Sequence, residues 1–275
     1  MKKELKDAAN AVEDASNSRA FVIAARAGFA VSGLLHLLIG SVAIQLALVK
    51  AGPAGPADQA GAVAQLARQP EGLLLLWAGF AACVALALWQ TSNAVFDYGH
   101  LEAKKKVAKK LSAAGKAVVF AVIALTFAAS ASGNSQTGGK TTSDFTVSII
   151  KAPGGAFLLI IIGAAIAGAG LVFVVLGLKG SFKKDLSLPP SGTARSVVTG
   201  LGMVGYIAEG VALFLVGLLF ILATVNARPQ ESTGLDGGLK ALREQPYGVY
   251  MLTAVGAGLI CYGLYLMVKA KFARM

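Results

Sequence analysis

Six long apolar runs constrain the fold of this chain more than any other feature of its sequence. A bilayer is crossed by about 20 predominantly apolar residues in a helix, and six segments reach that length: 27–49, 72–96, 113–132, 154–178, 196–225 and 247–268. These runs are apolar on nearly every side and lack the alternation of a barrel strand. With 56% hydrophobic and 14% charged residues, the chain is too apolar for a soluble domain. We therefore predict an all-α integral membrane protein with six transmembrane helices.

Basic residues are distributed unevenly between the two sides of these spans. The net charge is +11, and most lysines and arginines lie in the N-tail at 1–26, the connections at 97–112 and 179–195, and the C-tail. Cytoplasmic loops carry the excess of Lys and Arg in membrane proteins, so both termini are predicted in the cytoplasm. The N-tail lacks the organisation of a cleavable signal, and we expect the first span to remain as an anchor. Topology and anionic lipid account for the charge, so nucleic-acid binding is not predicted.

The connections on the opposite side repeat one pattern. ADQAGAVAQLARQPEG at 57–72 aligns without a gap with TGLDGGLKALREQPYG at 233–248, and SDFTVSIIKAPGG at 143–155 fits the same frame through its proline and glycine. Such self-similarity is the signature of a repeat, so each unit is predicted as a helix, an outer loop and a returning helix. The outer-loop motif comprises Asp58, Leu66, Pro70, Gly72, Asp236, Leu242, Pro246 and Gly248.

Three two-helix repeats follow from this alignment. Because each repeat has an even number of spans, all three enter the membrane from the same side, and a pseudo-threefold axis along the membrane normal should relate them. The predicted organisation is an N-tail at 1–26, repeat 1 at 27–96, a basic linker at 97–112, repeat 2 at 113–178, a linker at 179–195, repeat 3 at 196–270 and a C-tail at 271–275.

Glycines recur at matching positions in the first helix of each repeat. GFAVSGLLHLLIG at 28–40 lies over GYIAEGVALFLVG at 205–217, whereas the middle copy keeps Gly115 and has Phe120 and Phe127 at the other two positions. Small residues let spans approach closely where lipid supplies no hydrophobic drive. We therefore expect the first helices to pack together around the pseudo-axis. The predicted helix-packing residues are Gly28, Gly33, Gly40, Gly205, Gly210 and Gly217.

The glycine-spaced first helix, the DQAGAVAQL…QP.G loop and a returning helix ending in an aromatic residue such as Trp89 or Tyr265 resemble a known bacterial family. It is the membrane-protein family catalogued as domain of unknown function 1206, and the resemblance covers nearly the whole chain from Arg26 onward. It implies a six-span, multi-pass protein of the bacterial plasma (inner) membrane. It supplies no activity, substrate or cofactor.

One carboxylate lies inside an apolar run and needs a partner. Glu209 aligns with Ser32, His36 lies one turn outward of Ser32, and Lys116 lies one turn inward of the Glu209 level. Ionisable groups within spans are costly and usually face the bundle or water in pairs. We expect Glu209 to face the interior and pair with Lys116 or with His36. A structural polar clamp and a proton or cation site are the two interpretations.

The loops on each side suggest surface helices. Asp58 can cap a short outer helix that Pro70 stops, and Asp236 with Pro246 is expected to repeat that arrangement. Such helices would cover the turn or dock an external partner. On the inner side, the lysine-rich residues 97–116 have the composition of an interfacial helix held by anionic lipid, with a protein partner as the alternative.

The sequence favours no catalytic chemistry. The chain has no His-Glu-x-x-His, Gly-x-Ser-x-Gly or Gly-x-x-x-x-Gly-Lys-Ser/Thr motif, and we expect no enzyme activity, metal or cofactor. Cys83 and Cys261 fall within spans and predict no disulfide. We predict a structural or interaction component of a membrane complex, bound to lipid and open to a membrane-protein partner. The alternative is a small channel or a proton- or cation-coupled transport unit centred on Glu209.

Overall fold

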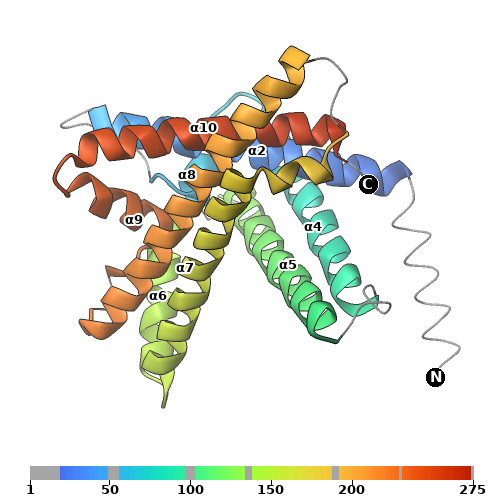
Figure 1. Ribbon diagram of the computed structural model, residues 1–275. Helices are drawn as coiled ribbons and strands as arrows, with labels where there is room; N and C mark the ends of the chain where they lie inside the picture. The colour runs from blue at the N-terminus through green and yellow to red at the C-terminus, as the bar shows by residue number, and fades with distance from the viewer. Residues whose placement is uncertain are drawn as a thin grey trace, which may run out of the picture.

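The computed structural model describes residues 19–48, 56–96, 103–133, 138–187, 192–228 and 231–273. Within these ranges the regular structure is helical, apart from one isolated β-bridge between Leu186 and Ala273. Figure 1 shows the arrangement of the helices. Their bounds are α2 Arg19–Leu48, α3 Gln59–Ala67, α4 Gly72–Phe96, α5 Ala103–Ala131, α6 Gly138–Ile150, α7 Gly155–Lys179, the 3-10 helix η1 Ser181–Asp185, α8 Gly192–Val225, α9 Gly234–Arg243 and α10 Gly248–Phe272.

Six of these helices are long and apolar enough to cross a membrane, which confirms the predicted number of spans. The crossing segments are Arg26–Leu48, Gly72–Ser92, Lys109–Ala131, Gly155–Lys179, Gly192–Val225 and Gly248–Phe272. The short helices α3, α6 and α9 each precede the second span of a repeat. We call the side on which Arg26 and Phe272 lie the terminal side, and the opposite side, which carries α3, α6 and α9, the short-helix side.

The basic segment before the third span is not the separate interfacial helix that its composition predicted. Helix α5 begins at Ala103 and continues through the lysines into the span without a break. Residues 103–112 are alanine, lysine, valine, leucine and serine, with neither glycine nor proline to interrupt a helix. The lysines therefore extend a transmembrane helix beyond its apolar part.

The six spans pack as three pairs that connect the repeats in a cycle. Helix α4 packs against α5, α7 against α8, and α10 against α2. Each pair joins the second helix of one repeat to the first helix of the next, and α10 returns to the first helix of the chain. Figure 1 shows the α4/α5 and α7/α8 pairs as two limbs that diverge beside the α2/α10 pair. The cyclic order agrees with three two-helix repeats in pseudo-threefold relation.

Glycines bring the helices of two of these pairs into backbone contact. A Cβ atom at Gly33 would lie 2.7 Å from the carbonyl oxygen of Gly263, and one at Gly210 would lie 2.6 Å from that of Gly170. These contacts are equivalent in the repeat alignment, because Gly33 corresponds to Gly210. Seven residues further along each helix, Gly40 contacts Gly256 and Gly217 contacts Gly163 in the same way.

The expectation that the glycines of the first helices pack against one another around the axis is therefore wrong. Gly33, Gly40, Gly210 and Gly217 face the second helix of the neighbouring repeat, and Gly28 and Gly205 face that of their own repeat. The reason is that those second helices carry glycines of their own, so that two backbones can approach on both sides. In the α4/α5 pair, Phe127 replaces the glycine. A Cβ atom at Gly79 would lie 2.6 Å from the Cε1 atom of Phe127, so the ring packs directly against this glycine.

Candidate intramembrane polar site

His36 on α2 and Glu209 on α8 face each other between the first and third repeats. The Nε2 atom of His36 lies 3.4 Å from the Oε2 atom of Glu209, and the two side chains are 14% and 16% exposed. His36 lies near the middle of the span Arg26–Leu48, and Glu209 near the middle of Gly192–Val225. The pair therefore sits far from either end of both helices.

The other ring nitrogen of His36 fixes the protonation pattern of the pair. Nδ1 lies 2.7 Å from the backbone carbonyl oxygen of Ser32. Because a carbonyl oxygen can only accept, Nδ1 must carry a hydrogen and donate it. Nε2 is then left to face Glu209, either protonated toward a carboxylate or accepting from a protonated carboxyl group.

The two forms have the same net charge. An imidazolium beside a carboxylate and an imidazole beside a carboxylic acid both sum to zero, with one proton shared between Nε2 and Oε2. A second proton, or the loss of the shared one, would leave a net charge in a low-dielectric surrounding, which is strongly unfavourable. This explains how Glu209 is tolerated within an apolar helix.

Packed aromatic rings close the terminal side of the pair. The ring of Tyr262, on α10, lies edge-on to His36 with centroids 5.0 Å apart. Tyr206 meets Tyr262 at 5.3 Å, and Phe182 of η1 stacks on Tyr206 at 5.1 Å. Tyr265 contacts both Tyr206 and Phe182. These residues form what we call the aromatic cluster.

Aliphatic side chains close the short-helix side. Leu35, Ile39 and Ala212 are 2%, 1% and 1% exposed, and they belong to the large apolar core of the protein. The polar pair thus lies between two tightly packed apolar regions. Tyr262 was not singled out from the sequence; the available signal was its alignment with Leu86 in the first repeat.

Lys116 does not join this site; of the two partners left open for Glu209, His36 is the one in contact with it. Lys116 is exposed on α5, and α5 packs against α4 rather than against α8. The repeat alignment placed Lys116 one helical turn from Glu209 in depth along the spans. The cyclic pairing of the helices, however, puts the two side chains on different limbs of the molecule. Ser32 contributes its carbonyl oxygen to the site, through His36.

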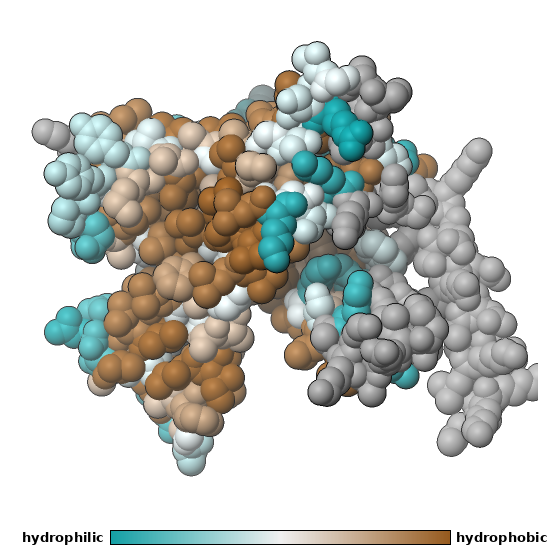
Figure 2. Space-filling model, in the orientation of Figure 1, coloured by the Kyte–Doolittle hydropathy of each residue, from teal (hydrophilic) through white to brown (hydrophobic). Residues whose placement is uncertain are grey.

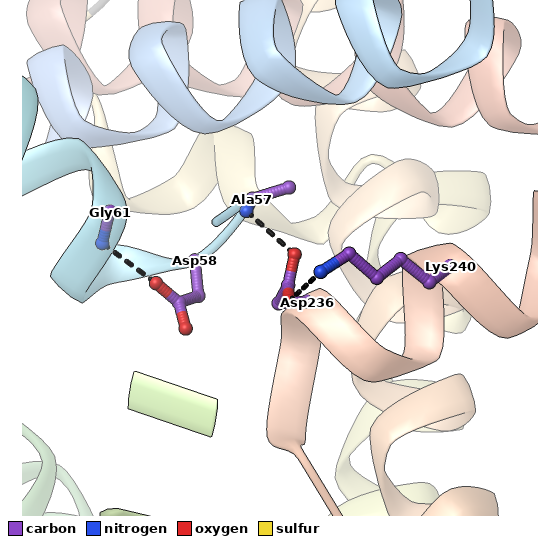
Figure 3. Close-up of polar contacts among 5 residues, drawn as sticks. All are labelled: Ala57, Asp58, Gly61, Asp236 and Lys240. Carbon is purple, nitrogen blue, oxygen red and sulfur yellow. Dashed lines mark hydrogen bonds and ion pairs between the residues drawn. The ribbon is translucent and has the colours of Figure 1, made fainter. Parts of the chain in front are cut away.

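The short-helix side contains a second polar cluster, drawn in Figure 3. Asp58 is the N-cap of α3, and its Oδ1 atom accepts from the amide of Gly61 at 2.8 Å. Asp236 accepts from the amide of Ala57 at 2.9 Å and from Lys240 Nζ at 2.6 Å. Asp58 and Asp236 are 5% and 8% exposed. Burial raises the pKa of Asp58 above its ordinary value, and the neighbouring charge of Asp236 raises it further.

The prediction that Asp236 caps its own short helix, as Asp58 does, is wrong. Thr233 occupies the N-cap position of α9, and Asp236 lies within the first turn. From there its carboxylate reaches Ala57, at the start of α3, and ties the outer loop of repeat 3 to that of repeat 1. Lys240 was missed by the sequence analysis, although its spacing of one helical turn from Asp236 is a recognised signal.

The remaining motif residues shape the turn into the returning span. Leu66 and Leu242 are buried, whereas Pro70 and Pro246 are exposed. The first glycine of each returning helix packs against a backbone carbonyl in the last turn of the short helix that precedes it. A Cβ atom at Gly72 would lie 2.5 Å from the Leu66 carbonyl oxygen, and Gly248 and Gly155 make the equivalent contacts with Leu242 and Ile149.

Neither polar cluster resembles a metal centre. Within the described ranges, no group of three or more His, Cys, Asp or Glu side chains converges on a point where it could hold a metal ion. Both cysteines, Cys83 and Cys261, are free thiols. What the two clusters have in common is that each joins the first repeat to the third.

The fold and the two clusters define a class: an all-helical, multi-pass membrane protein built from three two-helix repeats. The chain belongs to the family described as Domain of Unknown Function (DUF1206), whose sequence profile matches residues 27–97, 111–180 and 204–273. It is 26% identical over 252 residues to an uncharacterized protein of Bacillus subtilis (strain 168), YxxB, covering 91% of this chain and 90% of that protein. No solved structure matches the chain.

Proposed function

We propose that this protein is a non-catalytic structural component of a bacterial plasma membrane, a ring of three hairpins, open between α5 and α7, that holds a fixed shape for a membrane partner or lipid. Its rigidity derives from backbone contacts such as Gly33 with Gly263 and Gly210 with Gly170. The ring is completed where α10 packs on α2. The polar contacts of His36 with Glu209 and of Ala57 with Asp236 join the same two repeats.

The observation that carries the proposal is the His36–Glu209 contact of 3.4 Å. It joins α2 to α8 at mid-span, and its shared proton keeps it neutral. Hydrogen-bonded polar groups hold transmembrane helices in register because the alternative is an unsatisfied group in hydrocarbon. The pair thus acts as a polar clamp between the first and third repeats.

The proposed orientation places the terminal side in the cytoplasm. The lysines at the start of α5, Arg26 on α2, and Lys269 and Lys271 at the end of α10 lie on that side, in agreement with the positive-inside rule. The six apolar helices support a membrane location, and the relative in Bacillus subtilis supports a bacterial one. Alkylation of cysteines introduced at Ser187 and at Arg228 in intact cells tests this orientation: only the second should react with a membrane-impermeant reagent.

A proton- or cation-coupled unit is the second candidate, and one observation favours it. His36 and Glu209 form a titratable pair in the middle of two spans, and neither side chain is completely enclosed. Such pairs occur along proton paths in pumps and transporters. Against this candidate, the buried side chains of Leu35, Ile39 and Ala212 close the short-helix side of the pair, and the aromatic cluster closes its terminal side.

Proton flux into proteoliposomes separates the two candidates. The structural proposal predicts that vesicles with the wild-type protein acidify no faster than vesicles with Glu209→Gln, under an imposed membrane potential and a pH-sensitive dye inside. Glu231→Gln is the matched control, because Glu231 is an exposed carboxylate paired with Arg228 outside the spans. A wild-type flux that Glu209→Gln abolishes and Glu231→Gln preserves would replace the structural proposal with the transport one.

A further inference from the structure

The second repeat differs from the other two in that its two spans do not close on each other. In the first repeat α2 packs on α4, and in the third α8 packs on α10, but α5 and α7 do not pack along their length. The residues at the equivalent positions explain the difference.

Glycine forms a notch in the first helix of each repeat, and in repeats 1 and 3 the notch is filled. The Leu86 side chain occupies the space beside Gly28. At Gly205, a Cβ atom would lie 2.6 Å from the Tyr262 Cα atom. Counted from the prolines of the loop motif, Leu86 and Tyr262 occupy the same position of the returning helix. Leu86 fills the notch of repeat 1 with its side chain, whereas in repeat 3 the backbone of α10 at Tyr262 lies against Gly205.

In the second repeat this interaction is missing. A Cβ atom at Gly115 would meet nothing within 4 Å. The residue aligned with Leu86 and Tyr262 is Ala169, which is exposed on α7. Alanine lacks the side chain by which Leu86 fills the notch of repeat 1, and α7 does not approach α5 as α10 approaches α8, so the notch stays open.

Both helices that border the opening carry exposed apolar side chains. Only 17% of the most apolar stretch is buried in α5 and in α7, against 50% in α10. On α5, Val118, Val122 and Leu125 are exposed, and on α7 Leu171 and Val172 are exposed. Figure 2 shows apolar side chains gathered on the limb formed by α7 and α8.

A positive charge borders the notch. Lys116 follows Gly115 directly, is exposed, and lies inside the span Lys109–Ala131, toward its terminal-side end. A lysine at that depth extends its apolar stem along the helix and brings its ammonium group to the headgroup level. Lys109, the first residue of this span, is exposed as well. Basic pockets between transmembrane helices bind the headgroups of anionic phospholipids.

We propose that the opening between α5 and α7 is a binding site for one anionic phospholipid from the leaflet on the terminal side. Its acyl chains cover the apolar walls and fill the notch at Gly115 and Ala169. Its phosphate is bound by Lys116. A lipid fits both parts of the site, because it is a molecule with a long apolar chain and a negatively charged end.

Native mass spectrometry of the purified full-length protein tests this site, with phosphatidylglycerol and phosphatidylcholine added as competing probes. We expect retention of one phosphatidylglycerol in preference to phosphatidylcholine, and a fall in that preference of about fivefold for Lys116→Gln, the effect typical of one lysine near an anionic surface. Lys151→Gln, which removes an exposed lysine on the short-helix side, is the matched control and should leave the preference unchanged.

A second pair of variants tests the notch independently of charge. Ala169→Leu supplies the side chain that fills the notch of repeat 1 and should displace the lipid, whereas Ala156→Leu, also exposed on α7, should not. Equal retention of the two phospholipids, or an unchanged preference in Lys116→Gln, would overturn the proposal. Crosslinks between copies through a cysteine at Ala169 would overturn it too, since a second copy of the chain would then fill the opening. None of these outcomes depends on His36 or Glu209.

Discussion

Glu209 Oε2 lies 3.4 Å from His36 Nε2, and this contact joins the first helix of the third repeat to the first helix of the first. The hydrogen bond from His36 Nδ1 to the Ser32 carbonyl leaves one proton for the two facing atoms. The pair is therefore neutral in either protonation arrangement. It stabilises the ring only as long as both members are present, because each one alone would be a polar group without a partner in an apolar surrounding.

The clamp should show strong coupling in a double-mutant cycle. Glu209→Leu and His36→Leu should each lower the free energy of unfolding by about 2 kcal/mol, because each leaves an unpaired polar group. The double variant should lose clearly less than the sum of the two, since an apolar pair replaces a polar one. Reversible unfolding in mixed micelles measures all four proteins, and additive losses would show that the two residues do not act on each other.

The glycine contacts predict opposite effects of one substitution at two helical sites. Gly210→Ala should lower the free energy of unfolding by about 1–3 kcal/mol, because the new Cβ atom would lie 2.6 Å from the Gly170 carbonyl oxygen. Gly168→Ala should be neutral or slightly stabilising, because nothing lies within 4 Å of that position and alanine favours a helix. Equal effects in the same unfolding assay would contradict the proposed packing of α7 on α8.

Asp236 and Lys240 should differ in importance although they contact each other. Asp236→Ala leaves the amide of Ala57 without its acceptor and should lower stability by about 1–3 kcal/mol. Lys240→Met removes an ion pair whose lysine is 53% exposed, and the effect should stay below about 0.5 kcal/mol. Hydrogen exchange at α3 reports the result locally: the first variant should accelerate it, and the second should not.

Asp58 predicts a specific pH dependence on the short-helix side. Its pKa is raised in the folded protein by burial and then by Asp236, so the folded state binds this proton more tightly than the unfolded state. Stability should therefore increase as the pH falls from neutral through the raised pKa, and the gain should be complete below the ordinary pKa of an aspartate.

Asp58→Asn provides the test, because asparagine retains the oxygen that accepts from Gly61 while losing the charge. It should raise stability at neutral pH and flatten the pH profile in the acidic range. Asp144→Asn, which neutralises an exposed carboxylate on α6, is the control and should leave the profile intact. A profile that Asp58→Asn does not alter would assign the pH dependence to another group.

The spans and the repeats could be predicted from the sequence, because hydrophobic length and self-similarity are properties of single segments. Which helices become neighbours could not. The glycines of α2 and α8 indicated close contacts, but only the structure shows that Gly256, Gly263, Gly163 and Gly170 on returning helices are their partners. The alternation of first and second helices around the ring follows from this pairing.

The same limit applies to the polar sites. The sequence identified Glu209 and left His36 and Lys116 open as partners, since the level of a residue along a span says nothing about the direction it faces across the bundle. It identified Asp58 as a cap correctly placed at α3. The reach of Asp236 to Ala57 depends on how two outer loops distant in the sequence meet, which no local signal encodes.

Infrared difference spectroscopy of the protein in lipid tests the central claim most directly. The polar clamp predicts that the carboxyl signals assigned to Glu209 by comparison with Glu209→Gln shift in His36→Leu, because the two side chains are in contact, and that they exchange slowly in heavy water. Glu209 signals that His36→Leu leaves unchanged, and that exchange within seconds in heavy water, would contradict the clamp and favour a proton-handling site.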